Sequence, residues 1–171
     1  MPKKKSVLLL IVLFCLVAIC AISILYLNHN KSTLEIPEEA SEVVEKYMAA
    51  YKKGTQYSVE YSHFEDEFAR TAYIDSGDKL LDYKIESAEK INDNLYALTI
   101  QIKTEQTVFY NGDNYSKVYN FLALIDDTWY FLNGVAHVPL NIQDNLDKSR
   151  YVYNDENIVA AEDIVGAIEL N

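Results

Sequence analysis

The chain has 171 residues, half of them hydrophobic, and carries 26 acidic against 15 basic side chains. This length fits one domain with an appendage. With five Gly, three Pro and two Cys, the chain is neither collagen-like, nor disordered, nor a disulfide-stapled scaffold. The excess of negative charge repels nucleic acid, so we expect no nucleic-acid partner.

The first element is an apolar run from Val7 to Leu27, interrupted only by Ser23 and preceded by Lys3, Lys4 and Lys5. A helix of this length spans roughly 30 Å, the thickness of a hydrocarbon core. The sequence therefore predicts a transmembrane helix over 6–27. The lysines place the short N-terminus, 1–5, in the cytoplasm. A cleaved signal peptide stays open as an alternative, although its apolar core is usually only 7–15 residues long.

Both cysteines, Cys15 and Cys20, lie inside this run, so the rest of the chain can form no internal disulfide. This fits a bacterial surface better than a small extracellular animal domain. A lipoprotein is disfavoured because bulky Ile19 precedes Cys20. We expect the part after the anchor to lie outside the cell membrane, with 12 basic and 26 acidic side chains and a net charge of −14.

A polar tether, 28–36, leads to a predicted amphipathic helix that opens at Pro37 and ends before Gly54. Proline is tolerated in a first turn, and glycine is a common residue just past a helix end. The apolar residues recur with helical spacing. They are Ala40, Val43, Val44, Tyr47, Met48 and Tyr51.

The stretch from Tyr57 to Ala72 predicts one or two short helices that end before Ser76-Gly77-Asp78. Their expected buried face is the helically spaced set Tyr61, Phe64, Phe68 and Ala72.

From Leu80 the hydrophobic period changes to two, which predicts strands. In the first strand Tyr83, Ile85 and Ser87 share one face, and a turn follows at 92–94. The second strand runs from 95 to 110 with one wet face. It is longer than usual, so we expect it to bend or bulge.

A hairpin tip at 111–114 leads into a return strand over 115–125, whose later part is apolar on both faces apart from Asn120. A turn at 126–128 precedes a fourth strand over 129–132, and 135–139 closes the sheet at an edge. The sequence thus predicts an α+β domain over 37–142, with helices on a curved antiparallel four-stranded sheet. A polar tail, 143–171, is expected to end in a short helix with Ile158, Ala161, Val165 and Ile168 on one face.

This order of elements resembles the nuclear transport factor 2-like superfamily, in its membrane-anchored type from Gram-positive bacteria. The segments that carry the resemblance are Leu81–Ser87, Ile91–Tyr96 and Asp126–Phe131. The resemblance implies a cone-shaped domain with helices packed into a strongly curved sheet. The superfamily includes isomerases, dehydratases, scaffolds and conjugation-channel components, so fold alone selects no function.

Enzymes of this superfamily hold a carboxylate or histidine base inside the cone, for which His137 and His63 are weak candidates. No Asp or Glu falls in an inward strand phase. No Cys/His metal spacing and no phosphate-binding glycine loop occur, so we expect no metal and no cofactor. Tyrosines are enriched at interfaces. The candidate ligand or partner residues are Tyr83, Tyr96, Tyr119, Asn120, Tyr110 and Tyr115.

The sequence therefore predicts a single-pass, membrane-anchored, extracytoplasmic domain that binds or scaffolds without catalysis. Its expected partner is a protein or a second copy of the chain. Two alternatives remain: a ketosteroid-isomerase-like enzyme acting on a small apolar substrate, and a subunit of a secretion or conjugation channel.

Overall fold

The computed structural model describes residues 36–152 and 158–159. The predicted anchor at 6–27 and most of the predicted C-terminal helix lie outside these residues. Among the described residues, no helix combines the length and the apolar character that crossing a bilayer requires.

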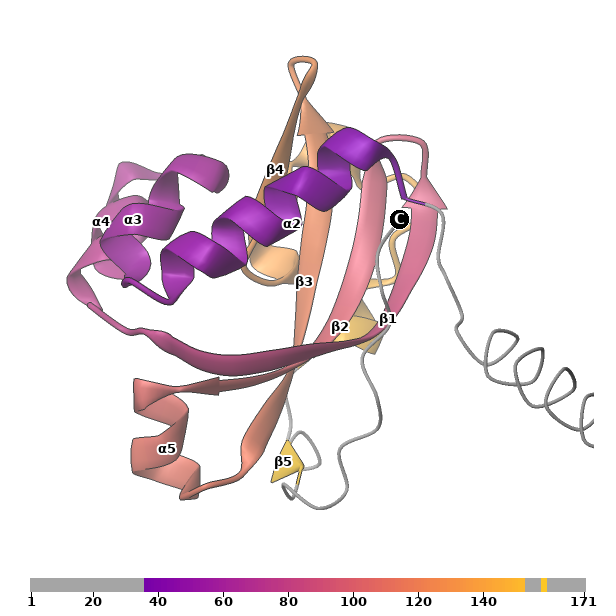
Figure 1. The fold of residues 1–171 in the computed structure, drawn as a ribbon. Coiled ribbons are helices and arrows are strands. Elements are labelled where there is room, and N and C mark those ends of the chain that lie inside the picture. The colour runs from indigo at the N-terminus through magenta and orange to yellow at the C-terminus, as the bar shows by residue number, and fades with distance from the viewer. Residues whose placement is uncertain (1–35, 153–157, 160–171) are drawn as a thin grey trace, which may run out of the picture. The chain divides into compact units, whose positions relative to one another are not determined.

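Helices come first along the described chain, and four antiparallel strands follow (Figure 1). The strands lie in the order β1-β2-β3-β4, and a fifth, two-residue strand pairs with the start of β3. The α+β architecture and the four-stranded meander predicted from the sequence are confirmed. In chain order the helices and strands are α2 (Glu38–Tyr51), α3 (Thr55–Ser58), α4 (Glu67–Asp75), β1 (Leu80–Asn92), β2 (Leu95–Thr104), α5 (Glu105–Asn111), β3 (Tyr115–Ile125), β4 (Thr128–Leu132) and β5 (Ile158–Val159).

Helix α2 lies across one face of the sheet (Figure 1) and buries the apolar stripe predicted from its spacing. Val44 and Tyr47 are almost completely buried, and the Tyr47 ring stacks on Phe131 of β4 at 4.0 Å between centroids. Burial of this face supplies the main stabilisation of the helix, since a single helix of this length is marginal in water.

Short helical segments over 55–61 and 67–75 confirm the predicted helices, but only half of the predicted buried face is correct, since Tyr61 and Phe64 are half-buried. Asp66 caps α4, its side chain accepting a hydrogen bond from the Phe68 N–H, so the helix begins later than expected. This start turns Tyr73 toward the core and leaves Phe68 80% exposed. Ala72 is exposed as well.

Strand β1 contains irregularities that change which residues face the core. Ile85 pairs with Ile100, but Ser87 pairs with Thr99, so Glu86 is an extra residue. A one-residue insertion moves the following side chains to the opposite face. Ala88 is therefore buried, and Ser87, predicted to share a face with Ile85, is exposed.

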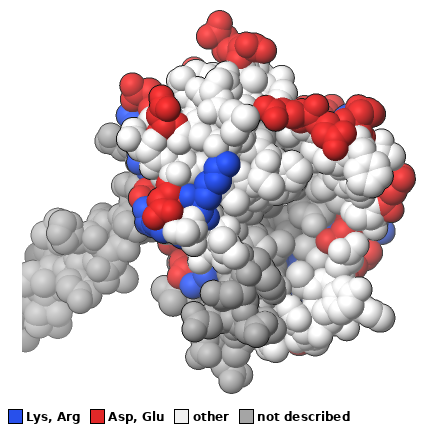
Figure 2. Space-filling view, turned by 180° about the vertical axis from the view of Figure 1, so that it is seen from behind, with Lys and Arg blue, Asp and Glu red and all other residues white. Residues whose placement is uncertain are grey.

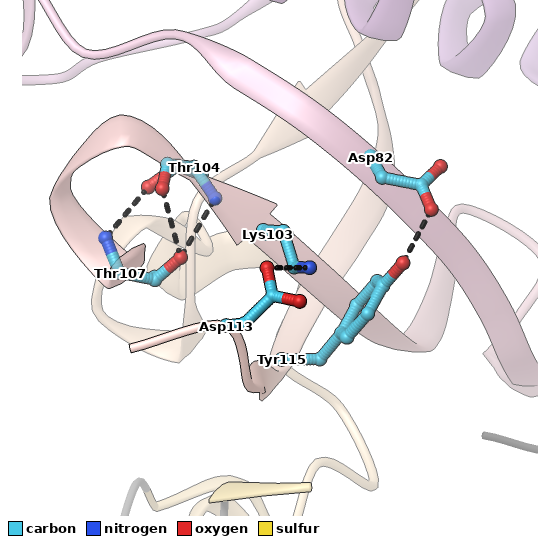
Figure 3. Close-up of polar contacts among 6 residues, drawn as sticks. All are labelled: Asp82, Lys103, Thr104, Thr107, Asp113 and Tyr115. Carbon is cyan, nitrogen blue, oxygen red and sulfur yellow. Dashed lines mark hydrogen bonds and ion pairs between the residues drawn. The ribbon is translucent and has the colours of Figure 1, made fainter. Parts of the chain in front are cut away.

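The predicted second strand over 95–110 is too long, because the strand ends at Thr104 and α5 takes over. Figure 3 shows the physical reason: Thr104 and Thr107 form a reciprocal capping box that starts a helix. Next to the two ends of α5, Lys103 pairs with Asp113 at 2.6 Å, and the Tyr115 hydroxyl donates to the Asp82 carboxylate (Figure 3). The predicted hairpin tip survives as the turn after α5, with Gly112 at φ +65°.

The predicted wet face of the second strand is also wrong, since a second hydrophobic core covers it. The segment after β4 folds back over this face in short 3-10 turns rather than closing the sheet as an edge strand. Two residues of this segment, Val138 and Tyr151, are buried against Phe121 and its neighbours. The buried members of this core are Leu95, Ala97, Phe121, Ala123, Leu132, Val138 and Tyr151.

Residues Ile158 and Val159 form strand β5, antiparallel to Tyr115 and Ser116, rather than the start of the predicted helix. A β-branched pair suits a strand better than a helix. The rest of that predicted helix, 160–171, lies outside the described residues.

Candidate functional site

A cavity of about 280 Å³ lies between the C-terminal half of α2 and the sheet. An apolar cavity of about 150 Å³ accommodates benzene, so this one holds a molecule of about ten non-hydrogen atoms. Its lining consists of apolar side chains and of polar side chains that carry no charge. The lining residues are Tyr47, Met48, Tyr51, Ile102, Val118, Tyr119, Asn120, Phe131, Asn133, Gly134 and Tyr151.

The cavity reaches an open edge of β3. Strand β4 pairs with β3 only over Phe121–Ile125, and β5 pairs only with Tyr115 and Ser116. Between them, residues 118–120 pair with no strand on this side within the described parts of the chain. Side chains from both faces of β3 therefore meet at this edge, which explains why adjacent residues of the strand line one cavity.

One wall of the cavity is backed by a chain of hydroxyl groups. The Tyr47 hydroxyl lies 2.7 Å from the Tyr73 hydroxyl, which lies 2.6 Å from the Ser58 hydroxyl. Tyr47 also donates to the Asn133 Oδ1 at 2.9 Å. A connected network of this kind fixes side-chain orientation in a low-dielectric site.

A separate set of polar contacts lies beside α5. Tyr51 donates from its hydroxyl to the Asp78 Oδ2 at 2.9 Å, and the backbone N–H of Gln106 donates to the Asp78 Oδ1 at 3.0 Å. The buried Asp78 carboxylate thus joins the end of α2 to the start of α5. It positions the Tyr51 ring at the cavity.

Three tyrosines at or behind the cavity wall, Tyr47, Tyr51 and Tyr73, stay protonated at neutral pH. Burial is the main reason that the pKa of Tyr47 rises well above its ordinary value, and the neighbouring Tyr73 adds to the effect. Burial likewise raises the pKa of Tyr51 and of Tyr73. These phenols therefore act as neutral hydrogen-bonding groups and not as bases.

Two asparagines complete the polar part of the lining. Asn120 Nδ2 donates to Asn133 Oδ1 at 3.1 Å. The remaining polar atoms of these side chains, Asn120 Oδ1 and Asn133 Nδ2, are buried and have no hydrogen-bond partner in the described structure. A buried amide half-satisfied in this way is unusual in folded proteins.

Of the residues predicted from the sequence, Asn120 and Tyr119 line the cavity. Tyr96 is buried elsewhere, 5.9 Å from Trp129 between ring centroids. Tyr83 is half-buried, and the Lys52 ammonium lies 5.7 Å from its ring centre.

The two tyrosines beside the hairpin tip have different environments and do not join the cavity. Tyr110 is 78% exposed on α5 and meets Phe109 edge to face. Tyr115 is buried at the base of the hairpin, and its hydrogen bond to Asp82 raises its pKa to about 12.

The two candidate histidines do not reach the cavity. The His137 ring lies against Phe64, and partial burial lowers its pKa. The His63 ring lies against Tyr130. Among the described residues, no group of three or more His, Cys, Asp or Glu is arranged to hold a metal ion.

Sequence reasoning missed Tyr47, Tyr51 and Asn133 as site residues. The two tyrosines belong to the predicted helix stripe, and Asn133, one residue beyond the predicted fourth strand, received no role. The signal that points to Asn133 is a polar residue directly after the apolar run Trp129–Leu132 and before Gly134. Only tertiary structure places it beside Asn120.

Acidic side chains are spread over the face shown in Figure 2, with uncharged surface between them and few Lys or Arg. The cavity lining itself contains no charged side chain. A highly charged ligand would thus find no counter-charge in the cavity walls.

Comparison of the chain with models of protein families and with the curated proteins gave no match. Among solved structures, one neighbour is an NTF-2-like protein of unknown function from Silicibacter pomeroyi, 15% identical, with a TM-score of 0.36. The match covers 55% of this chain and 87% of that one. The neighbour bears the name of the superfamily that the sequence resembles, but a likeness this distant carries no conclusion about function.

Proposed function

We propose that residues 37–142, with Tyr151 from the segment that follows, form a nuclear transport factor 2-like binding domain. It takes a small uncharged molecule into the cavity between α2 and the sheet. The observation that carries the proposal is a cavity of about 280 Å³ whose lining combines apolar side chains with neutral hydrogen-bonding groups. A few placed polar groups in an apolar pocket are typical of small-molecule sites.

The geometry favours binding over the ketosteroid-isomerase-like alternative. Such an enzyme needs a base within hydrogen-bond reach of its substrate. Both candidate histidines lie outside the cavity lining, and burial raises the pKa of the lining tyrosines Tyr47 and Tyr51, whose hydroxyls act as hydrogen-bond donors.

Fluorine NMR on the full-length protein in lipid nanodiscs tests the proposal. We expect the fluorine resonance of 4-fluorophenylacetone to broaden and shift when the wild-type protein is present, but not with empty nanodiscs. Val118→Trp fills the cavity and should abolish the effect. Leu140→Trp is the matched control, because Leu140 is 80% exposed and lies outside the lining. Absence of binding by the wild type at millimolar probe would refute the proposal.

We further propose that the segment 6–27 anchors the protein as a single membrane-spanning helix, with the domain outside the cell. The support is its length, its apolar character and the flanking lysines. Alkaline phosphatase fused after residue 171 should be active, and the same fusion should stay in the membrane after carbonate washing. Release of a shorter mature chain would instead show a cleaved signal peptide.

A protein partner or self-association stays a prediction, as does membership of a secretion or conjugation channel. In-cell crosslinking followed by purification from native membranes tests both. A recurrent set of transfer proteins would support the channel subunit, and crosslinks between copies of the chain would support self-association. A protein that crosslinks to nothing contradicts both.

A further inference from the structure

The cavity has a wall that comes from the second face of the sheet. Val118 and Phe131 belong to the hydrophobic core under α2, whereas Tyr119 and Tyr151, which also line the cavity, pack in the second core. The rings of these two tyrosines meet edge to face, with 5.7 Å between their centroids. The cavity therefore reaches both faces of the sheet at the open edge of β3.

Tyr151 is the last residue of the segment 135–151, which folds over the second face. Its ring meets the Phe121 ring edge to face at 5.1 Å between centroids, and the residue is only 8% exposed. Tyr119 is packed against it from the side of β3. The position of the Tyr151 ring thus decides how the cavity is walled on this face.

Side chains of β1 tie this segment to the sheet. Its backbone hydrogen bonds within the described chain stay largely inside the segment, as in the bond from the Arg150 N–H to the Asp147 carbonyl. Asn92, at the end of β1, supplies one tie to the sheet, because its Nδ2 donates to the carbonyl oxygens of Ile142 and Asp144 at 3.2 and 3.0 Å. This tie holds the middle of the segment.

Glu89 supplies the tie at the end of the segment. It lies opposite Ala97 of β2, a member of the second core. Arg150 donates to both carboxylate oxygens, from Nη1 to Oε1 at 3.0 Å and from Nη2 to Oε2 at 2.9 Å. The Tyr151 hydroxyl also donates to Oε2, at 3.2 Å. A bidentate pair of this kind fixes geometry as well as charge.

These contacts hold the Tyr151 ring from more than one side. Its hydroxyl is bound at Glu89, the Arg150 guanidinium lies 5.5 Å from its ring centre, and its other contacts are with aromatic rings. A side chain that is already ordered in the free protein does not have to be ordered when a ligand binds, and this favours affinity.

We propose that Glu89 is a positioning residue for the cavity, although it does not line it. By holding Arg150 and Tyr151, it keeps the Tyr151 ring in place as the wall on the second face and so sets the affinity for the ligand. This inference rests on the proposed function, since it concerns the same cavity. It goes further by assigning control of binding to a carboxylate of β1.

The test measures the affinity of the full-length protein in nanodiscs for 4-fluorophenylacetone by fluorine NMR. Glu89→Ala removes all three hydrogen bonds and should weaken binding about three- to tenfold, because the ligand must then order the Tyr151 side chain. Glu42→Ala is the matched control. Glu42 pairs with Lys46 at 2.7 Å and has a similar exposure, 55% against 46% for Glu89, but its place on α2 is outside the cavity lining. It should keep the wild-type affinity.

Two further readouts separate positioning from a general loss of stability. The fluorine resonance of the bound ketone should move in Glu89→Ala, because the Tyr151 ring near the ligand changes place, whereas partial unfolding would only lower the bound fraction. Glu89→Gln keeps one oxygen that can accept a hydrogen bond, so it should restore part of the affinity. If Glu89→Ala does not fold, Arg150→Gln removes the bidentate partner at an exposed position and should weaken binding in the same way.

An unchanged affinity in Glu89→Ala would overturn this inference and leave the proposed function intact. A loss of affinity without movement of the bound resonance would overturn it as well, and so would equal losses in Glu89→Ala and Glu42→Ala, since the effect would then follow net charge. If the wild-type protein does not bind the ketone, the proposed function fails together with the inference.

Discussion

The two faces of β3 are both covered, but they are covered in different ways. Toward α2 the strand presents Val118, Asn120 and Leu122, and beside the first two lies a cavity with a half-bonded amide. Toward the segment 135–151 it presents Phe121 and Ala123, both fully buried in a dry core. One strand thus supplies most of a binding wall on one side and close packing at Phe121 and Ala123 on the other, while Tyr119 reaches the same cavity from the second face.

The difference comes from the shape of what covers each face. Helix α2 is a straight rod, while β1 and β2 curve strongly (Figure 1). Close contact is made at Ala40 and Val44, nearer the start of the helix, and space remains near its end at Tyr47 and Tyr51. On the other face, Val138 and Tyr151 of the irregular segment pack directly against Phe121 and its neighbours.

The largest expected loss of stability comes from truncating a side chain on the face of β3 that is covered by the segment 135–151. Phe121→Ala should lower the free energy of unfolding by about 3–5 kcal/mol, because it removes a fully buried ring and leaves a void. Urea unfolding of the purified protein measures the loss. The matched cavity-side change, Val118→Ala, should cost far less because Val118 is only half-buried. Similar losses for the two variants would contradict the distinction between the faces.

A smaller loss is expected when the polar link beside the cavity is removed. Asp78→Ala leaves the Tyr51 hydroxyl and the Gln106 N–H without their acceptor, which should cost about 2–4 kcal/mol. Asp78→Asn keeps one acceptor oxygen in place and should lose about half as much. Thermal unfolding compares the two variants, and a neutral Asp78→Ala would show that the link is not structural.

Replacing a small side chain of β3 with a larger one tests the same difference between the two faces. Ala123→Leu on the dry face should destabilise the protein by about 1–3 kcal/mol, because a close-packed core has no room for the larger side chain. Val118→Leu adds one methylene beside the cavity and should leave the stability nearly unchanged while weakening ligand binding. A destabilised Val118→Leu would mean that the cavity is smaller than the structure indicates.

The smallest expected effect is a pH dependence of stability that comes from His137, in the segment after β4. Partial burial lowers the pKa of His137 below its ordinary value of 6.5, so the folded state favours the neutral ring. Its contribution to stability is fully present above about pH 6.5. That contribution is lost as the pH falls through the folded-state pKa. Unfolding measured from pH 7.5 to 5 should show a shallow decline, and His137→Gln should flatten it. An unchanged slope in this variant would assign the decline to other groups.

The sequence by itself determined the elements whose signals are local. Helix α2 follows from a helical stripe between Pro37 and Gly54, and β3 from an apolar run bounded by turn residues. The turn at Asp126 and Asp127, both with positive φ, was predicted from its residue types. Such patterns are decided within a few residues, so they can be read without knowing what packs against them.

Tertiary structure alone decided which surfaces are covered and which residues meet. The wet face expected for β2 is buried because a distant polar segment folds over it, and polarity along the sequence does not reveal that packing. The bulge at Glu86 changed the inward face of β1, and α4 turned Tyr73 inward in place of Ala72. The binding site depends on the same kind of information. Asn120 and Asn133 are thirteen residues apart, and only the pairing of β3 with β4 brings their amides within 3.1 Å of one another.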